Sequence, residues 1–178
     1  MLKTIVIVLV LLVVAVAAVL AYAATKPATF QVQRTASIKA PPEKIFALIN
    51  DLRGWGAWSP YEKKDPAMKR AYHGQESGKG AVYEWDGDKN VGKGRMEITD
   101  VSAPSKIVIK LDFFRPFEAH NTASFTMEPK GEATDVTWAM DGPNLFVGKV
   151  MSIFIDMDKM IGKDFEEGLS NLKRLAKR

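Results

Sequence analysis

Three polar residues stand out because the strand pattern places them among side chains that face the predicted core: Arg34, Tyr83 and Asn121. An arginine there can pair with an acidic head group, a tyrosine can donate a hydrogen bond to a carbonyl, and an asparagine can do either. The alternative is structural, because most buried polar groups bond to a neighbouring backbone group. For Arg34 the structural alternative is a carboxylate or the sheet edge. The sequence leaves both interpretations open.

Residues for covalent or metal chemistry are scarce. The chain has no cysteine and only two histidines, His73 and His120, and neither has a second histidine or a fixed carboxylate at ligand spacing. No serine, histidine and acid are arranged as a nucleophilic triad. Both Gly-Lys-Gly segments fall in predicted hairpins, whereas a phosphate loop opens a helix after a buried strand. We therefore predict no catalytic residue, no metal and no cofactor.

The charge distribution disfavours nucleic acid as a partner. Formal net charge is +4, and the basic residues are scattered apart from a cluster at the C-terminal end. A nucleic-acid-binding surface usually carries a continuous basic stripe with interleaved aromatic residues. A weak attraction to anionic lipid head groups is compatible with this charge. The sequence identifies no protein partner.

The chain begins with an apolar run that is long enough to cross a bilayer. Residues 5–24 carry no charge, and about twenty residues in a helix span the hydrocarbon core. We predict a signal-anchor that contacts the membrane through residues 4–24. The competing interpretation is a signal peptide cleaved after Ala23, because Ala21-Tyr22-Ala23 resembles a cleavage site.

The charges on the two sides of this run do not fix its orientation. A bacterial-type N-terminal anchor usually leaves its domain outside the cytoplasm, so we expect an extracytoplasmic domain, and a secreted one if the run is cleaved. The predicted organisation is a transmembrane anchor over residues 1–25, a short linker over residues 26–28 and one domain over residues 29–178.

Two periodicities indicate the elements that position the polar residues. Between Phe30 and Asp141, apolar and polar residues alternate in six or seven predicted strands, interrupted by one helix that starts near Pro42. From Asp156 onward, apolar residues recur at helical spacing as far as Leu175. This order predicts an antiparallel sheet that curves around one long C-terminal helix.

Such a sheet and helix enclose an apolar interior, and we expect part of it to be a ligand cavity. Methionine and aromatic side chains suit guests of irregular shape, and apolar pockets with few polar groups fit lipid-like or aromatic ligands. The alternative is that these side chains fill the interior completely. The predicted lining residues are Tyr83, Trp85, Met96, Phe113, Asn121, Phe125, Trp138, Met140, Phe154, Met157, Met160 and Ile161, with Arg34 as a polar candidate and Trp55 and Trp58 at the mouth.

Four segments carry a resemblance to a known superfamily. They are RTASIKAPPEKIFALINDLRGWGAWSP (34–60), GKGAVYEWDGDKNVGKGRMEITD (78–100), TDVTWAMDG (134–142) and MDKMIGKDFEEGLSNLKRLA (157–176). They resemble the SRPBCC superfamily, and within it the polyketide-cyclase/dehydrase branch, over roughly residues 30–176. The resemblance implies an α+β, START-like helix-grip fold with an apolar cavity between sheet and helix, and cyclases of this fold work mainly by shaping the substrate. It leaves function open, because the superfamily uses one pocket for many purposes.

We expect a membrane-tethered, non-catalytic binder of a hydrophobic small molecule or lipid. The first alternative is a cyclase or dehydratase acting on an apolar or aromatic substrate, which requires a polar pair buried in the cavity. The second is an interaction or stress-response module that docks through the loop from Trp55 to Tyr61. That module requires a filled core and exposed tryptophans.

Overall fold

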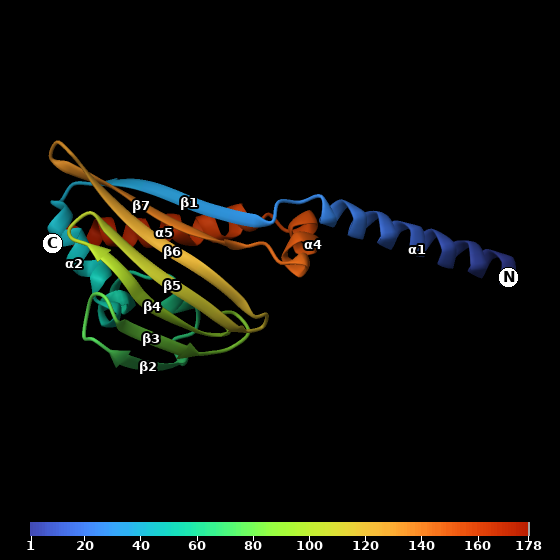
Figure 1. Ribbon diagram of the computed structural model, residues 1–178, viewed down its shortest axis with the longest axis horizontal. Coiled ribbons are helices and arrows are strands. Elements are labelled where there is room, and N and C mark those ends of the chain that lie inside the picture. The colour runs from blue at the N-terminus through green and yellow to red at the C-terminus, as the bar shows by residue number, and fades with distance from the viewer. Residues whose placement is uncertain (178) are drawn as a thin grey trace.

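The computed structural model describes residues 1–177, in which a seven-stranded antiparallel sheet curves around a C-terminal helix (Figure 1). The strands are β1 (Thr29–Ile38), β2 (Lys69–Gly74), β3 (Ala81–Asp86), β4 (Lys93–Ser102), β5 (Lys106–Arg115), β6 (Ala119–Lys130) and β7 (Ala133–Pro143). The helices are α1 (Leu2–Ala24), α2 (Pro42–Asn50), the 3-10 helix η1 (Leu52–Ala57), α3 (Tyr61–Lys64), α4 (Phe146–Phe154) and α5 (Met157–Ala176). The predicted α+β helix-grip fold is confirmed.

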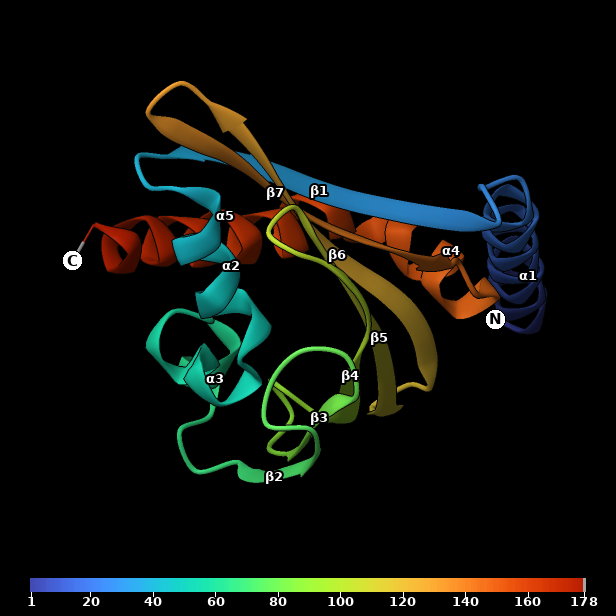
Figure 2. The same ribbon diagram turned by 60° about the vertical axis from the view of Figure 1, so that its left-hand side comes forward.

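The strand order is β1-β7-β6-β5-β4-β3-β2, so the first strand pairs with the last and the other strands form a meander. Figure 2 shows the sheet curling so that α2, α3 and α5 lie within its concave side. The pairing of β4 with β5 shifts register at Lys93/Gly94 and again at Ile98/Asp100, and such irregularities increase local bending. A Cβ on Gly94 would lie 2.3 Å from the ring of Trp85, so this glycine makes room for the indole on the concave face.

Helix α5 has the features that its sequence pattern predicts. The side chain of Asp156 caps its start by accepting a hydrogen bond from the backbone N–H of Lys159 at 2.9 Å. The part of its apolar stripe from Phe165 to Leu172 is buried against the sheet, and the ring of Phe165 stacks on Trp138 of β7 with centroids 4.1 Å apart. The stripe holds α5 inside the curved sheet.

Helix α1 projects away from the domain with its apolar side chains exposed (Figure 1). By length and composition it could cross a membrane, although a signal sequence would meet the same criterion. Its C-terminal end packs against α4, where Ala23 is 0% exposed. The backbone N–H of Asn144, just before α4, donates to the carbonyl of Ala28 at 2.8 Å. The end of α1 is therefore joined to the domain by packing and by a hydrogen bond.

Candidate functional site

A cavity of about 550 Å³ lies between the concave face of the sheet, the start of α5, and α4. Its inner wall consists of buried side chains, among them Met96, Ile109, Ala123 and Trp138. Most of the wall is aliphatic or aromatic. The predicted cavity is therefore present, and the alternative of a completely filled interior is wrong.

The mouth of the cavity can be located from the lining residues that are also exposed. Phe117 lies between β5 and β6, Leu145 and Val147 lie at the start of α4, and Met160 lies on α5. All four are at least half exposed. The cavity therefore opens at the end of the domain that carries α4.

Most of the side chains predicted to line a pocket do line this cavity. They are Tyr83, Trp85, Met96, Phe113, Asn121, Trp138, Met140, Met157, Met160 and Ile161, together with Trp55. Strand alternation assigned the sheet residues to the concave face, and helical spacing assigned the residues of α5 to its apolar stripe. That they contact a ligand stays a prediction.

The aromatic residues at the closed end do not lie where the sequence placed them. Trp58 is 0% exposed and does not line the cavity, so its prediction as a mouth residue is wrong. Trp55 is 6% exposed and lies in the wall, also away from the mouth. Phe125, predicted to line the pocket, packs in the core behind the wall with both tryptophans at centroid distances of 6.0 Å. The three rings pack against one another, and of the three only Trp55 borders the cavity.

Phe154 is also misplaced by the sequence, because it is 72% exposed and does not line the cavity. The sequence interpretation extended the apolar stripe of α5 back into a separate helix. Ile155 and Asp156 are not helical and separate α4 from α5. Residues earlier in α4, such as Gly148 and Met151, reach the cavity instead.

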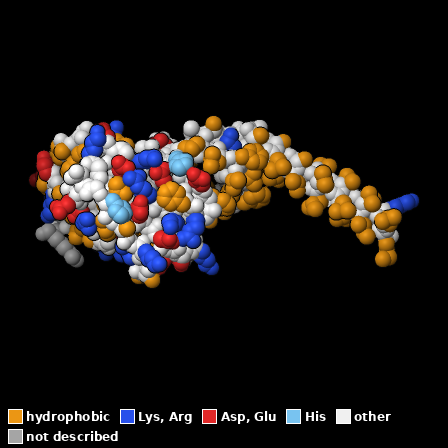
Figure 3. All heavy atoms as spheres, turned by 60° about the horizontal axis from the view of Figure 1, so that its bottom comes forward, with side chains coloured by type: hydrophobic (Ala, Val, Ile, Leu, Met, Phe, Trp, Pro, Cys, Tyr) orange, Lys and Arg blue, Asp and Glu red, His pale blue; other side chains and the backbone are white. Residues whose placement is uncertain are grey.

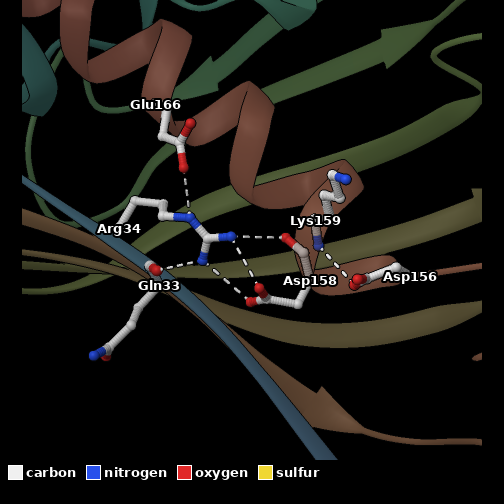
Figure 4. Close-up of polar contacts among 6 residues, drawn as sticks. All are labelled: Gln33, Arg34, Asp156, Asp158, Lys159 and Glu166. Atoms are coloured by element: carbon white, nitrogen blue, oxygen red, sulfur yellow. Dashed lines mark hydrogen bonds and ion pairs between the residues drawn. The ribbon is translucent and has the colours of Figure 1, made fainter.

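Arg34 lies outside the cavity and joins β1 to α5 (Figure 4). Its guanidinium pairs with Asp158 at 2.9 Å and with Glu166 at 2.8 Å. It packs over Gly162, where an added Cβ would lie 2.0 Å from the guanidinium. The hydrogen bonds to Asp158 and Glu166 raise the pKa of Arg34 above its ordinary value. Its prediction as a polar pocket residue is wrong, and the structural alternative, a carboxylate partner, is correct.

Sequence reasoning missed the main polar group of the cavity wall, which is built on Glu62 of α3. The hydroxyl of Tyr83 donates to Oε1 of Glu62 at 2.5 Å, and Nε of Arg70 donates to Oε2 at 2.7 Å. Burial, followed by the hydrogen bond to Glu62, raises the pKa of the Tyr83 hydroxyl far above its ordinary value. Tyr83 is therefore a neutral hydrogen-bond donor at physiological pH. Helix α3 has four residues, which is too short for a periodicity to indicate Glu62.

A second polar group lies beside the first. Nζ of Lys64 pairs with Asp164 of α5 at 2.6 Å, and it lies 5.0 Å from the centroid of the Tyr61 ring. Burial, followed by the charge of Asp164, raises the pKa of the Tyr61 hydroxyl. These side chains line the cavity and join α3 to α5.

Asn121, like Tyr83, is a polar wall residue that sequence reasoning placed correctly. Its Oδ1 is buried without a hydrogen-bond partner, and its Nδ2 makes only a 4.0 Å contact with the sulfur of Met140. A Cβ on Gly142 would lie 2.2 Å from Oδ1, so a glycine is required opposite this amide. Because a buried amide without full hydrogen bonding is costly, Asn121 is available to bond a polar atom of a ligand.

The histidines lie outside the cavity lining. His120 and Asp112 face each other across β6 and β5, and Nδ1 of His120 lies 2.7 Å from Oδ1 of Asp112. The expectation that neither histidine has a fixed carboxylate is therefore wrong, because cross-strand register placed this one. Within residues 1–177, no group of three or more histidine, aspartate or glutamate side chains could hold a metal ion.

Comparison with known proteins gives a family. Residues 29–177 match the family described as "Polyketide cyclase / dehydrase and lipid transport". The chain belongs to this family.

Three solved structures illustrate the likeness of this fold to known proteins. Protein CV1439 from Chromobacterium violaceum aligns with a TM-score of 0.58 and 14% identity, over 86% of this chain and 99% of that one. The major latex-like protein 151 of Panax ginseng aligns at 0.57 and 15%, over 84% and 99%. The di-domain aromatase/cyclase BexL of the BE-7585A biosynthetic pathway aligns at 0.61 and 12%, over 88% and 53%. At these identities the likeness extends to the fold alone. No curated protein matches the sequence.

Membership of the polyketide cyclase/dehydrase and lipid transport family supports a role in binding or cyclising a hydrophobic molecule. The cavity wall is compatible with either role.

Proposed function

We propose that this protein is a membrane-tethered binding protein that holds a hydrophobic small molecule or lipid in its cavity. The observation that carries the proposal is the apolar cavity of about 550 Å³ between the sheet and α5. That volume lies within the range of about 300 to 1,000 Å³ typical of small-molecule sites. In this proposal residues 1–25 anchor the chain, residues 26–28 link it, and residues 29–178 bind the ligand outside the cytoplasm.

The polar groups of the wall indicate what kind of ligand fits. Tyr83 and Glu62 bond each other, so only Asn121 has an amide with unused hydrogen-bonding capacity among the polar wall groups discussed above. A ligand that is mostly hydrocarbon with one hydroxyl, carbonyl or ester group satisfies both the apolar wall and this amide. A highly charged ligand would lose its hydration without compensating partners.

A second candidate is a cyclase or dehydratase, which the Glu62–Tyr83 pair in the wall favours. In such an enzyme the single O–H of Tyr83 would turn from Glu62 to donate to a substrate carbonyl, and its raised pKa keeps that hydroxyl protonated. If the protein is such an enzyme, Tyr83→Phe should abolish turnover and retain ligand binding. Docking through the aromatic loop is disfavoured, because both of its tryptophans are buried.

Tryptophan fluorescence offers a direct binding test on the full chain. The protein has four tryptophans. Three line the cavity, and the ring centroid of the fourth, Trp58, lies 4.7 Å from that of Trp55. We would place the full chain in phosphatidylcholine nanodiscs and add 9,10-dibromostearic acid, whose bromine atoms quench tryptophan at short range. Saturable quenching is the expected result.

A matched pair of variants separates cavity binding from quenching by bromine in the bilayer. Ala123 lines the cavity, whereas its neighbour Thr122 is exposed on the opposite face of β6. Ala123→Phe should abolish the saturable quenching because the added ring occupies space that the acyl chain needs, and Thr122→Phe should retain it. Equal quenching in both variants would overturn the proposal.

A further inference from the structure

The end of the domain next to α1 carries six apolar side chains that are 41% to 72% exposed. They form what we call the rim, which consists of Phe117, Leu145, Phe146, Val147, Phe154 and Ile155. In both ribbon views the β5–β6 connection and α4 lie at the α1 end of the domain. Figure 3 shows the hydrophobic side chains of α1 continuing onto the adjoining part of the domain. Exposed apolar surface of this kind usually marks a contact site.

Half of the rim residues lie at the mouth of the cavity. Phe117, Leu145 and Val147 belong both to the rim and to the cavity wall. A surface that covers the rim therefore also covers the mouth. Whatever the rim contacts is the medium into which the cavity opens.

The position of helix α1 indicates which surface the rim contacts. Its last turn packs on α4, and the carbonyls of Pro27 and Ala28 accept hydrogen bonds from Asn144 at 3.2 and 2.8 Å. The domain is thus held against the end of α1 and cannot swing away while these contacts persist. If α1 crosses a bilayer, the rim lies at the level where α1 leaves it.

Two further features fit a lipid surface. Tyr22 and Lys26, at the end of α1, are joined by a hydrogen bond of 3.2 Å, and tyrosine and lysine are typical of the membrane–water interface. Residues 143–155 contain one lysine and no acidic residue. An apolar helix with a basic side chain suits the boundary between acyl chains and anionic head groups.

We propose that the rim inserts into the interfacial layer of the bilayer that holds α1, so that the cavity opens to the lipid and takes up an acyl-chain lipid directly from it. This inference rests on the proposed function, because it assumes both the anchor and the hydrophobic ligand. It adds the route of uptake and assigns α4 the role of a membrane-contacting helix. In this arrangement Asn121 hydrogen-bonds to an oxygen of the lipid once the acyl chain has entered the cavity.

Site-directed spin labelling tests the contact. Because the chain has no cysteine, Phe117→Cys, Phe146→Cys and Phe154→Cys each give a single labelling site in the full chain. The matched control is Glu132→Cys, in the β6–β7 turn at the opposite end of the domain (Figure 1). In nanodiscs of phosphatidylcholine and phosphatidylglycerol, the rim labels should be accessible to oxygen and shielded from a water-soluble nickel complex, and the control label should be accessible to the nickel complex.

Two results would overturn the contact with lipid. Rim labels as accessible to the nickel complex as the control would place the rim in water. Rim labels shielded from both reagents would place it against protein, such as a second copy of the chain.

Uptake is tested by the rate of tryptophan quenching. In Phe146→Asp and Phe154→Asp, dibromostearate should quench about tenfold more slowly, because a carboxylate is unfavourable in the apolar layer, yet reach the final extent seen without substitution. Thr122→Asp is the control, with an unchanged rate. An unchanged rate in the rim variants would refute uptake through the rim and leave the proposed function intact. Absence of saturable quenching in all of these proteins, the unsubstituted one included, would refute the proposed function itself.

Discussion

The hydroxyl of Tyr83 offers a sharp test of the polar group in the cavity wall. Tyr83→Phe removes one oxygen atom and leaves the ring, which packs between Tyr72 and Trp85 at centroid distances of 5.1 and 6.0 Å. The change therefore deletes the 2.5 Å hydrogen bond to Glu62 and little else. Arg70 still pairs with Glu62 at 2.7 Å, so the carboxylate keeps one strong partner.

The size of the effect follows from the charge and burial of the acceptor. Only 10% of the Glu62 side chain is exposed, so water cannot easily replace the lost donor. A hydrogen bond to a charged group contributes about 1.5 to 3 kcal/mol, and the remaining pair with Arg70 favours the lower end, about 2 kcal/mol. For a chain of this size, that loss corresponds to a fall in melting temperature of about 4 to 8 °C.

Urea unfolding of the full chain in nanodiscs, followed by tryptophan fluorescence, measures this difference. Tyr72→Phe is the matched control, because that neighbouring phenol interacts with Glu62 through its charge and makes no hydrogen bond to it within residues 1–177. We expect the control to change the free energy of unfolding by less than about 0.5 kcal/mol. Equal losses in the two variants would refute the assignment of Tyr83 as the donor that Glu62 depends on.

Two further predictions concern the convex face and α5. Hydrogen bonding to Asp112 raises the pKa of His120. Burial opposes a lower pKa of the Asp112 carboxyl, but hydrogen bonds from His120 and Lys110 outweigh it and lower that pKa. The pair should therefore stabilise the fold most between about pH 4 and 6.5, because the histidine contribution is lost as pH rises through its folded pKa and the aspartate contribution is lost as pH falls through its own. NMR titration of His120 checks this, with Asp112→Asn expected to return the histidine pKa towards about 6.5. In α5, Gly168→Ala should destabilise by about 1 to 3 kcal/mol despite the better helix propensity of alanine, because the added Cβ would lie 2.6 Å from the Trp138 ring. Gly56→Ala, whose Cβ would meet no atom within 4 Å, is the control for the same unfolding measurement, and equal effects of the two would contradict the proposed crowding.

Sequence periodicity alone predicted much of the wall. Tyr83, Trp85 and Met96 lie on inward positions of alternating strands, and Ile161 lies on the apolar stripe of α5. Alternation determines which face of a sheet a residue occupies, and helical spacing determines which stripe it joins. Those assignments need no knowledge of the neighbours.

Depth and partners were decided by the tertiary structure. Phe125 and Met140 share a face of the sheet, yet one is covered by two indoles and the other borders the cavity, because the curvature of the sheet and the placement of η1 set which positions are covered. Arg34 occupies an inward position as well, but α5 presents Asp158 and Glu166 to it. Parity cannot distinguish a wall from a core or from an ion pair.

The polar group and the mouth depend on segments far apart in the chain. Glu62 meets Tyr83 because a four-residue helix is folded across the sheet, and no local pattern of residues records that contact. The sequence determined that α1 and α4 are apolar, since composition is a local property. Only the tertiary structure placed α4 against α1 and beside the mouth of the cavity, because that arrangement depends on how β1 and β7 pair and bring the two ends of the domain together.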